Sequence, residues 1–188
     1  MEIRDANPDR DAVACAAIYA PHVEGSAVSF EEEASDAAAM AARIAATQAT
    51  HPWLVAGSGG GLAGFAYGCL HRERAAYRWS ADVSIYIDAD SRRAGLGRAL
   101  YAELLDRLRG QGFQLACAGI TLPNQASVAL HASFGFEPVG VYRRVGWKAG
   151  AWRDVGWWHL QLAPPNAERP GEPLPPAEPT PRLPWGHA

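Results

Sequence analysis

An arginine-rich segment with two glycines, near the middle of the chain, carries the strongest chemical signal. Residues 92–98 read Arg-Arg-Ala-Gly-Leu-Gly-Arg, between an apolar run at 83–88 and an amphipathic segment at 99–109. A strand, a glycine loop and a helix in this order point several backbone N–H groups at one anion. Gly95 and Gly97 have no Cβ, so an anion can approach the main chain closely. The arginines add charge at the positive end of the helix dipole. The segment therefore predicts a diphosphate-binding site.

The glycine spacing distinguishes between kinds of phosphate site. A dinucleotide fold requires G-x-G-x-x-G in its first βα turn, and a P-loop requires G-x-x-x-x-G-K-[ST]. Neither pattern occurs, and R-x-x-G-x-G is present instead. This pattern resembles the pyrophosphate loop of the GNAT superfamily of acyl-CoA N-acyltransferases, which holds the diphosphate of coenzyme A. On these residues alone, a glycine-capped turn with solvated arginines is the alternative.

Two titratable residues are placed to serve acyl transfer from a thioester to an amine. The amine must lose a proton and the departing thiolate must gain one. Asp82 begins the strand before the glycine loop and shares a face with Ser84 and Tyr86, so it is the candidate base, acting through water. His131 is the candidate acid. The alternatives are an exposed strand-end aspartate and a half-buried histidine.

Asn124, Ser127 and His131 are spaced three and four residues apart, so they share one helix face. The Asn124 amide can bond to the peptide-like groups of a pantetheine arm, or it can simply cap its helix. In a loop before Asp82, Arg72, Arg74 and Tyr77 offer a fork for a carboxylate, phosphinate or sulfone oxygen. Solvated loop charge is the alternative there.

The elements that must position these residues follow one another as β-αα-ββ-β-α-β-α-ββ, which predicts an α/β fold with a central mixed sheet. Turn signals and apolar periodicity define the elements. The predicted strands are 2–6, 53–56, 62–71, 83–88, 114–120, 139–145 and 155–162, and the predicted helices are 9–19, 36–47 (capped by Asp36), 99–109 and 124–134.

Composition restricts the class of protein. The chain has 188 residues, 48% of them apolar and 20% charged, which suits one ordinary globular domain. A net charge of −3 argues against nucleic-acid binding, and no apolar run reaches the length of a membrane span. Met1–Asp5 lacks the apolar core of a signal peptide, so a cytoplasmic location is expected. The three cysteines and six histidines show no metal-ligand spacing, and we expect no metal.

The chain changes composition after residue 162. Nine of its 14 prolines lie between residues 163 and 188. Such a segment supports neither a helix nor a strand ladder, so we expect a catalytic domain at 1–162 and a flexible proline-rich tail at 163–188.

Several further blocks resemble the phosphinothricin N-acetyltransferase family, in the same order and over nearly all of residues 2–162. They are Ser29-Phe30, Pro52-Trp53-Leu54-Val55-Ala56, Gly95-Leu96-Gly97 followed by Leu100-Tyr101, Leu122-Pro123-Asn124, and Gly146-Trp147-Lys148 through Trp152-Arg153-Asp154-Val155-Gly156. The resemblance implies acetyl-CoA as donor and an amino-acid-like acceptor such as phosphinothricin, methionine sulfoximine or methionine sulfone.

The resemblance also implies roles for single residues. The backbone of Ile85, Tyr86 and Ile87 would meet the pantetheine arm, Asn124 and Ser127 would line it, and His131 would take the place of a tyrosine proton donor. The acceptor would be framed by Arg72, Arg74 and Tyr77, with Phe30. Residues implied to hold the diphosphate are Arg92, Arg93, Ala94, Gly95, Leu96, Gly97 and Arg98. The sequence departs from the family at Asp82, where relatives have a glutamate, so its carboxylate is one methylene shorter.

The leading hypothesis is direct acetyl transfer in a ternary complex, because no cysteine is placed as an acyl-carrying nucleophile. One alternative is a related enzyme acting on a protein N-terminus, a polyamine or an aminoglycoside, and another is a non-catalytic acyl-CoA-binding module. Trp147, Trp152, Trp157 and Trp158 crowd the last two strands, which favours a homodimer interface over purely internal packing.

Overall fold

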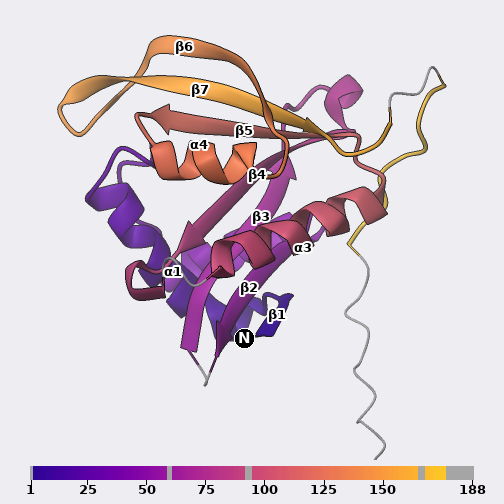
Figure 1. The fold of residues 1–188 in the computed structure, drawn as a ribbon. Helices are drawn as coiled ribbons and strands as arrows, with labels where there is room; N and C mark the ends of the chain where they lie inside the picture. Colours follow the sequence, from indigo (N-terminus) through magenta and orange to yellow (C-terminus); the bar gives the residue numbers. More distant parts are fainter. Residues whose placement is uncertain (1, 59–60, 92–94, 165–167, 177–188) are drawn as a thin grey trace, which may run out of the picture.

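The computed structural model describes residues 2–58, 61–91, 95–164 and 168–176. A seven-stranded sheet in the order β1-β2-β3-β4-β5-β7-β6 carries helices on both faces (Figure 1). The predicted α/β class and element order are confirmed. The elements are β1 (Glu2–Asp5), α1 (Pro8–Glu24), α2 (Ala37–Gln48), β2 (Trp53–Ser58), β3 (Gly61–Leu70), β4 (Ser80–Ile87), α3 (Leu96–Gln111), β5 (Leu115–Leu122), α4 (Gln125–Ala132), β6 (Glu137–Lys148) and β7 (Ala151–Gln161), with short 3₁₀ turns at Ala75–Tyr77 and Ala89–Ser91.

Side-chain caps fix the helix starts. Asp36 accepts a hydrogen bond from the N–H of Ala39 at 2.8 Å, so the predicted cap of α2 is confirmed. Asn7 caps α1 in the same way. The predicted end of α1 at Tyr19 is wrong by five residues. The helix continues through Pro21 to Glu24, and Val23 in this added turn is fully buried.

Two apolar clusters lie on opposite faces of the sheet. Leu100, Leu104 and Leu108 of α3 pack on one face with Val83. Ile18 of α1 and Ile44 of α2 pack on the other, and Tyr86 lies against their cluster. Because successive residues of a strand point to opposite faces, Asp82, Ser84 and Tyr86 share the α1–α2 face.

The strand that carries Asp82 is longer than predicted. β4 begins at Ser80 rather than Val83, so Asp82 lies inside the strand and not just before it. It pairs in register with Cys69 of β3 and Cys117 of β5. Among the described strand pairs, β4–β5 alone runs parallel, and its pairing covers just Ser80–Asp82 against Leu115–Cys117. Beyond this point β4 stays paired with β3 and β5 with β7, but the two strands no longer pair with each other, so the sheet opens there.

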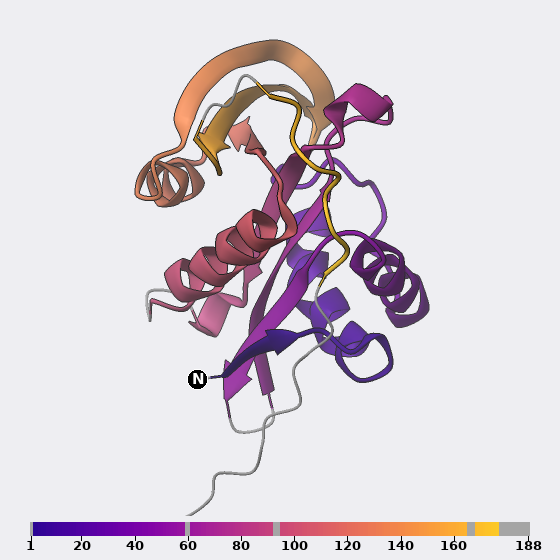
Figure 2. The ribbon, with the colours of Figure 1, turned by 90° about the vertical axis from the view of Figure 1, so that its right-hand side faces the viewer.

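The segment 168–176 lies along the body of the molecule and is drawn in yellow in Figure 2. The Trp79 indole N–H donates to the carbonyl of Gly171 at 2.7 Å, and the Gln111 amide donates to that of Leu174 at 2.6 Å. Glu172 accepts two hydrogen bonds from Arg78. Flexibility of the whole tail stays a prediction. No helix in the described ranges combines the length and apolar character that a membrane span requires.

Candidate active site

A cleft lies where β4 and β5 separate. Its walls come from both strands and from α4, with Val28 of the α1–α2 connection on one side. Beyond Asp82 and Cys117 the facing edges of the two strands make no ladder with each other, so their peptide groups are open to a ligand. The lining residues are Val28, Val83, Ser84, Ile85, Tyr86, Ala118, Gly119, Ile120, Thr121, Asn124, Ser127 and His131.

The glycine segment ends at the start of α3. Gly95 caps the helix at φ +76°, a left-handed conformation that glycine adopts without strain. Helix α3 starts at Leu96, so the prediction that Gly97 precedes the helix is wrong; Gly97 lies in the first turn, beside Ile85 and Ile87. Arg98 donates to the Ser133 hydroxyl at 3.0 Å. Arg92, Arg93 and Ala94 lie outside the described residues.

His131 lines the cleft with both ring nitrogens engaged. Its Nδ1 lies 2.7 Å from the carbonyl oxygen of Ser127, and its Nε2 lies 2.7 Å from the Tyr101 hydroxyl. A carbonyl can only accept, so Nδ1 carries the proton and Tyr101 donates to Nε2 in the neutral ring. Burial lowers the pKa of His131, since the side chain is 3% exposed. Asn124, Ser127 and His131 therefore line the same cleft, as predicted. The Asn124 side chain also caps α4, because its Oδ1 accepts a hydrogen bond from the N–H of Ser127.

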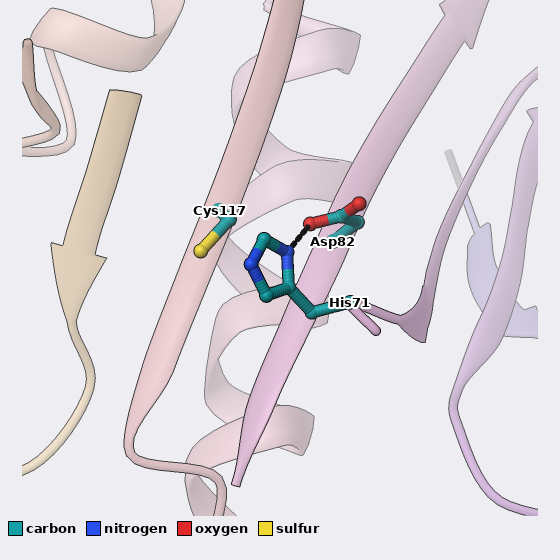
Figure 3. A group of neighbouring side chains, drawn as sticks. All are labelled: His71, Asp82 and Cys117. Carbon is teal, nitrogen blue, oxygen red and sulfur yellow. Dashed lines mark hydrogen bonds and ion pairs between the residues drawn. The ribbon is translucent and has the colours of Figure 1, made fainter. Parts of the chain in front are cut away.

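Asp82 is bonded to a residue that the sequence analysis did not single out. His71 Nδ1 lies 2.6 Å from Asp82 Oδ1, and the two side chains are 16% and 25% exposed (Figure 3). Desolvation raises the pKa of Asp82, and the bond from His71 acts against that shift. The overlooked signal was the strand register: Cys69 pairs with Asp82, and His71 follows two residues later on the same face.

Cys117 completes the group. Its sulfur and the donor atoms of His71 and Asp82 lie within 4.8 Å of one another. His71 and Asp82 are bonded to each other, and the Cys117 thiol lies beside this pair. Burial raises the pKa of the Cys117 thiol to about 11 and that of Cys69 to about 11, so both are neutral near pH 7.

The predicted acceptor residues border this group. The ring of Tyr77 lies 5.8 Å from that of His71, and the Arg72 guanidinium lies over Trp157 at 5.5 Å. Arg74 is exposed on the same loop. Phe30 lies farther out, on the α1–α2 connection, packed against Gly146 of β6. The Lys148 ammonium donates to the carbonyl of Glu31, so this connection is tied to the β6–β7 hairpin.

Residues 3–157 match the family model described as "Acetyltransferase (GNAT) domain". The chain belongs to the GNAT acetyltransferase family. It is 36% identical over 174 residues to a phosphinothricin N-acetyltransferase of Streptomyces viridochromogenes, covering 93% of this chain and 94% of that protein. It is also 36% identical over 115 residues to an L-methionine sulfoximine/L-methionine sulfone acetyltransferase of Pseudomonas paraeruginosa, covering 61% and 67%.

The fold matches solved structures of this GNAT family closely. The crystal structure of a phosphinothricin acetyltransferase from Sinorhizobium meliloti in complex with acetyl-CoA superposes with a TM-score of 0.86 at 33% identity, covering 91% of this chain and 93% of that one. The chain is thus an acetyl-CoA-dependent GNAT N-acetyltransferase, and the matches indicate no metal-dependent family. The alternative of a non-catalytic binding module is wrong.

The cleft fits acetyl-CoA on its own geometry. The open edge of β4 offers peptide N–H and C=O groups to the amides of a pantetheine arm, and the Asn124 amide faces the same space. The N-terminus of α3, capped by Gly95, offers backbone N–H groups to the diphosphate.

Proposed function

We propose that this GNAT enzyme acetylates the α-amino group of a small amino acid or analogue that carries an anionic or strongly polar end. Phosphinothricin, methionine sulfoximine and methionine sulfone are the model acceptors, since the relatives are named for them. The observation that supports this best is the placement of the bonded pair His71–Asp82 beside Arg72 and Tyr77, next to the opening of the sheet. A proton acceptor and a cation would then act together beside the point where β4 and β5 separate.

Transfer is direct, with both substrates bound. A covalent acyl-cysteine would need a thiolate, and the pKa of about 11 at Cys117 keeps that thiol protonated. Acetyl-CoA supplies the acetyl group as a thioester. The backbone N–H of Ile85, on the open edge of β4, polarises the thioester carbonyl. The Arg72 guanidinium, with Arg74, holds the carboxylate or phosphinate of the acceptor.

Two protons must move during the reaction. An acceptor enters as an ammonium, so one N–H proton goes to the bonded pair of His71 and Asp82 before the nitrogen attacks. The second N–H proton leaves the nitrogen as the amide forms and passes to the departing thiolate on the His131 side of the cleft. The Tyr101 hydroxyl, which donates to Nε2, holds the His131 ring in this position.

The exposed aromatic residues of the β6–β7 hairpin support a homodimer. Trp147 and Trp152 are 60% and 50% exposed, and their rings stack edge to face at 5.6 Å. Val139, Val145 and Tyr142 of the same hairpin are at least half exposed. Covering such a patch with a second copy removes apolar surface from water and lowers the free energy.

We place the enzyme in the cytoplasm, as its free cysteines suit a reducing compartment.

Turnover on matched amines tests the proposed acceptor class. Purified protein is assayed for thiol release from acetyl-CoA with methionine sulfone, and with the same amine lacking its carboxylate; mass spectrometry identifies the acetylated product. The proposal expects a kcat/KM at least about tenfold higher for the amino acid, the contribution of one charge-assisted hydrogen bond to its carboxylate. A preference for spermidine, an aminoglycoside or a peptide N-terminus would overturn it in favour of another GNAT acceptor.

A further inference from the structure

Asp82 is poorly suited to take a proton from an amine by itself. Its carboxylate is one methylene shorter than a glutamate, and Oδ1 is already engaged by His71 at 2.6 Å. The reach that Asp82 lacks is supplied by the ring bonded to it.

We propose that His71 is the catalytic base of this enzyme and that Asp82 is the positioning residue that orients it. This rests on the proposed direct transfer to an amine. An ionised carboxylate can only accept, so the Asp82 bond fixes the proton of neutral His71 on Nδ1. The lone pair is then on Nε2, and Figure 3 shows that nitrogen on the side of the ring away from Asp82.

Several side chains surround the His71 ring. Asp82 Oδ1 bonds its Nδ1, and the Arg72 guanidinium donates to the His71 carbonyl at 2.7 Å. The thiols of Cys69 and Cys117, one on each strand beside Asp82, are neutral. Trp157 and Tyr77 pack edge-on against the ring. These contacts come from β3, β5, β7 and the loop before β4, so the ring is held from several sides.

The group resembles a Cys-His-Asp nucleophile triad, but Cys117 does not act as one. Its thiol is 6% exposed and its pKa is about 11. No hydrogen bond joins Cys117 to His71 among the described contacts. The unit is therefore a His–Asp pair that happens to border a buried thiol.

The proposed reaction conserves its protons and electrons. His71 Nε2 takes one proton from the acceptor ammonium and becomes an imidazolium paired with Asp82. The freed amine nitrogen forms a bond to the thioester carbonyl carbon, and the C–S bond breaks with its electron pair on sulfur. The second N–H proton neutralises the thiolate, and His71 returns its proton to solvent. Net products are the acetamide, coenzyme A and one proton.

Replacing His71 with asparagine tests the base directly. Asparagine keeps an N–H that can bond Asp82 but has no titrating nitrogen. With methionine sulfone, or with whichever amine the enzyme prefers, we expect kcat to fall by about 100-fold or more while KM for acetyl-CoA stays within about twofold. The fall of kcat/KM on the acidic side of the pH profile should disappear with it, because that limb reports protonation of the base. Imidazole added to His71→Gly should restore part of the rate, which a purely structural role would not permit.

Two controls separate the outcomes. Cys117→Ala should keep kcat within about threefold, because its thiol carries no acyl group. If His71→Asn keeps the rate while Asp82→Asn loses it, Asp82 itself is the base and the proposal is overturned.

A measurement on the free enzyme tests the role of His71 independently of which amine the enzyme accepts. Nitrogen-15 NMR of free enzyme above pH 7 should show His71 protonated on Nδ1 and bare on Nε2. Protonation on Nε2 instead would overturn the proposal, even if acetylation of amino acids is found. Failure of the acceptor panel alone would leave the tautomer result unchanged.

Discussion

Asp82 and Cys117 form the last register pair at which β4 and β5 still run side by side. Beyond this pair the strands diverge, and the space between them is the cleft that ends at Asn124, Ser127 and His131. The proposed His71–Asp82 base thus lies where the strands begin to diverge, and the edge of β4 proposed to bind the thioester begins one residue later. In the proposed mechanism, a single interruption of strand pairing brings the base and the thioester close together.

Gly95→Ala should weaken acetyl-CoA binding. Gly95 adopts φ +76°, where a Cβ costs roughly 1 kcal/mol, and it orients the first N–H groups of α3. We expect the free energy of unfolding to fall by about 1 kcal/mol and KM for acetyl-CoA to rise about tenfold, measured by urea denaturation and steady-state kinetics. Gly110→Ala is the matched control: it lies in the same helix with open space around it and should gain stability, with KM unchanged.

The strand pattern and the caps could be predicted from the sequence, because alternation and helix signals are local. Asp36 as a cap, the order of the elements, and the shared face of Asn124, Ser127 and His131 all follow from spacing alone. The partner of Asp82 could not be found in this way. His71 lies 11 residues away and meets Asp82 only through the register of β3 on β4, which tertiary packing decides.

Tyr101→Phe should be destabilising and should slow turnover. The Tyr101 hydroxyl is the one described partner of His131 Nε2, and both side chains are buried. Its loss leaves a buried ring nitrogen unsatisfied, which costs about 1–3 kcal/mol. Thermal denaturation should show this loss, and kcat should fall several-fold because the His131 ring loses the bond that holds it. His131→Phe, which removes the acceptor as well, should slow kcat further; full activity in both variants would remove His131 from the mechanism.

Arg72→Ala should raise KM for an anionic amino acid about tenfold or more, with KM for acetyl-CoA unchanged, because a charge-assisted pair to the acceptor is lost. Its guanidinium also lies over Trp157, so part of the loss is packing. The amine without a carboxylate separates the two effects. If Arg72 binds the carboxylate, kcat/KM for this amine should be nearly the same in the wild type and in Arg72→Ala. If Arg72 only packs on Trp157, kcat/KM should fall in the variant as much for this amine as for the amino acid.

Stability should fall in mild acid because of His51. The side chain is 5% exposed and stacks on Phe113, and burial lowers the pKa of His51 to about 4 from 6.5. The folded state therefore favours neutral His51, and the unfolded state binds more protons between these values. Stability is complete above about pH 6.5 and is lost as the pH falls toward 4, by about 2–3 kcal/mol from this group. Urea denaturation from pH 7 to 4.5 should show it, and His51→Phe should flatten the slope.

Trp147→Asp should convert a dimer into a monomer. Trp147 is 60% exposed and meets Trp152 edge to face at the tip of the β6–β7 hairpin, where a charge would repel a second apolar face. Light scattering at micromolar concentration should give twice the 20.1 kDa chain mass for the wild type and about the chain mass for the variant.

Val13→Asp is the matched control for this charge, because Val13 is 67% exposed on α1, outside the hairpin. It should leave the mass unchanged. The hairpin is also tied to the α1–α2 connection, through the Lys148 bond to Glu31 and the packing of Phe30 on Gly146. Monomerisation should therefore raise KM for the acceptor more than KM for acetyl-CoA, since Phe30 lies on the acceptor side and the β4 edge does not. Equal effects on both substrates would instead indicate that the hairpin supports the whole fold.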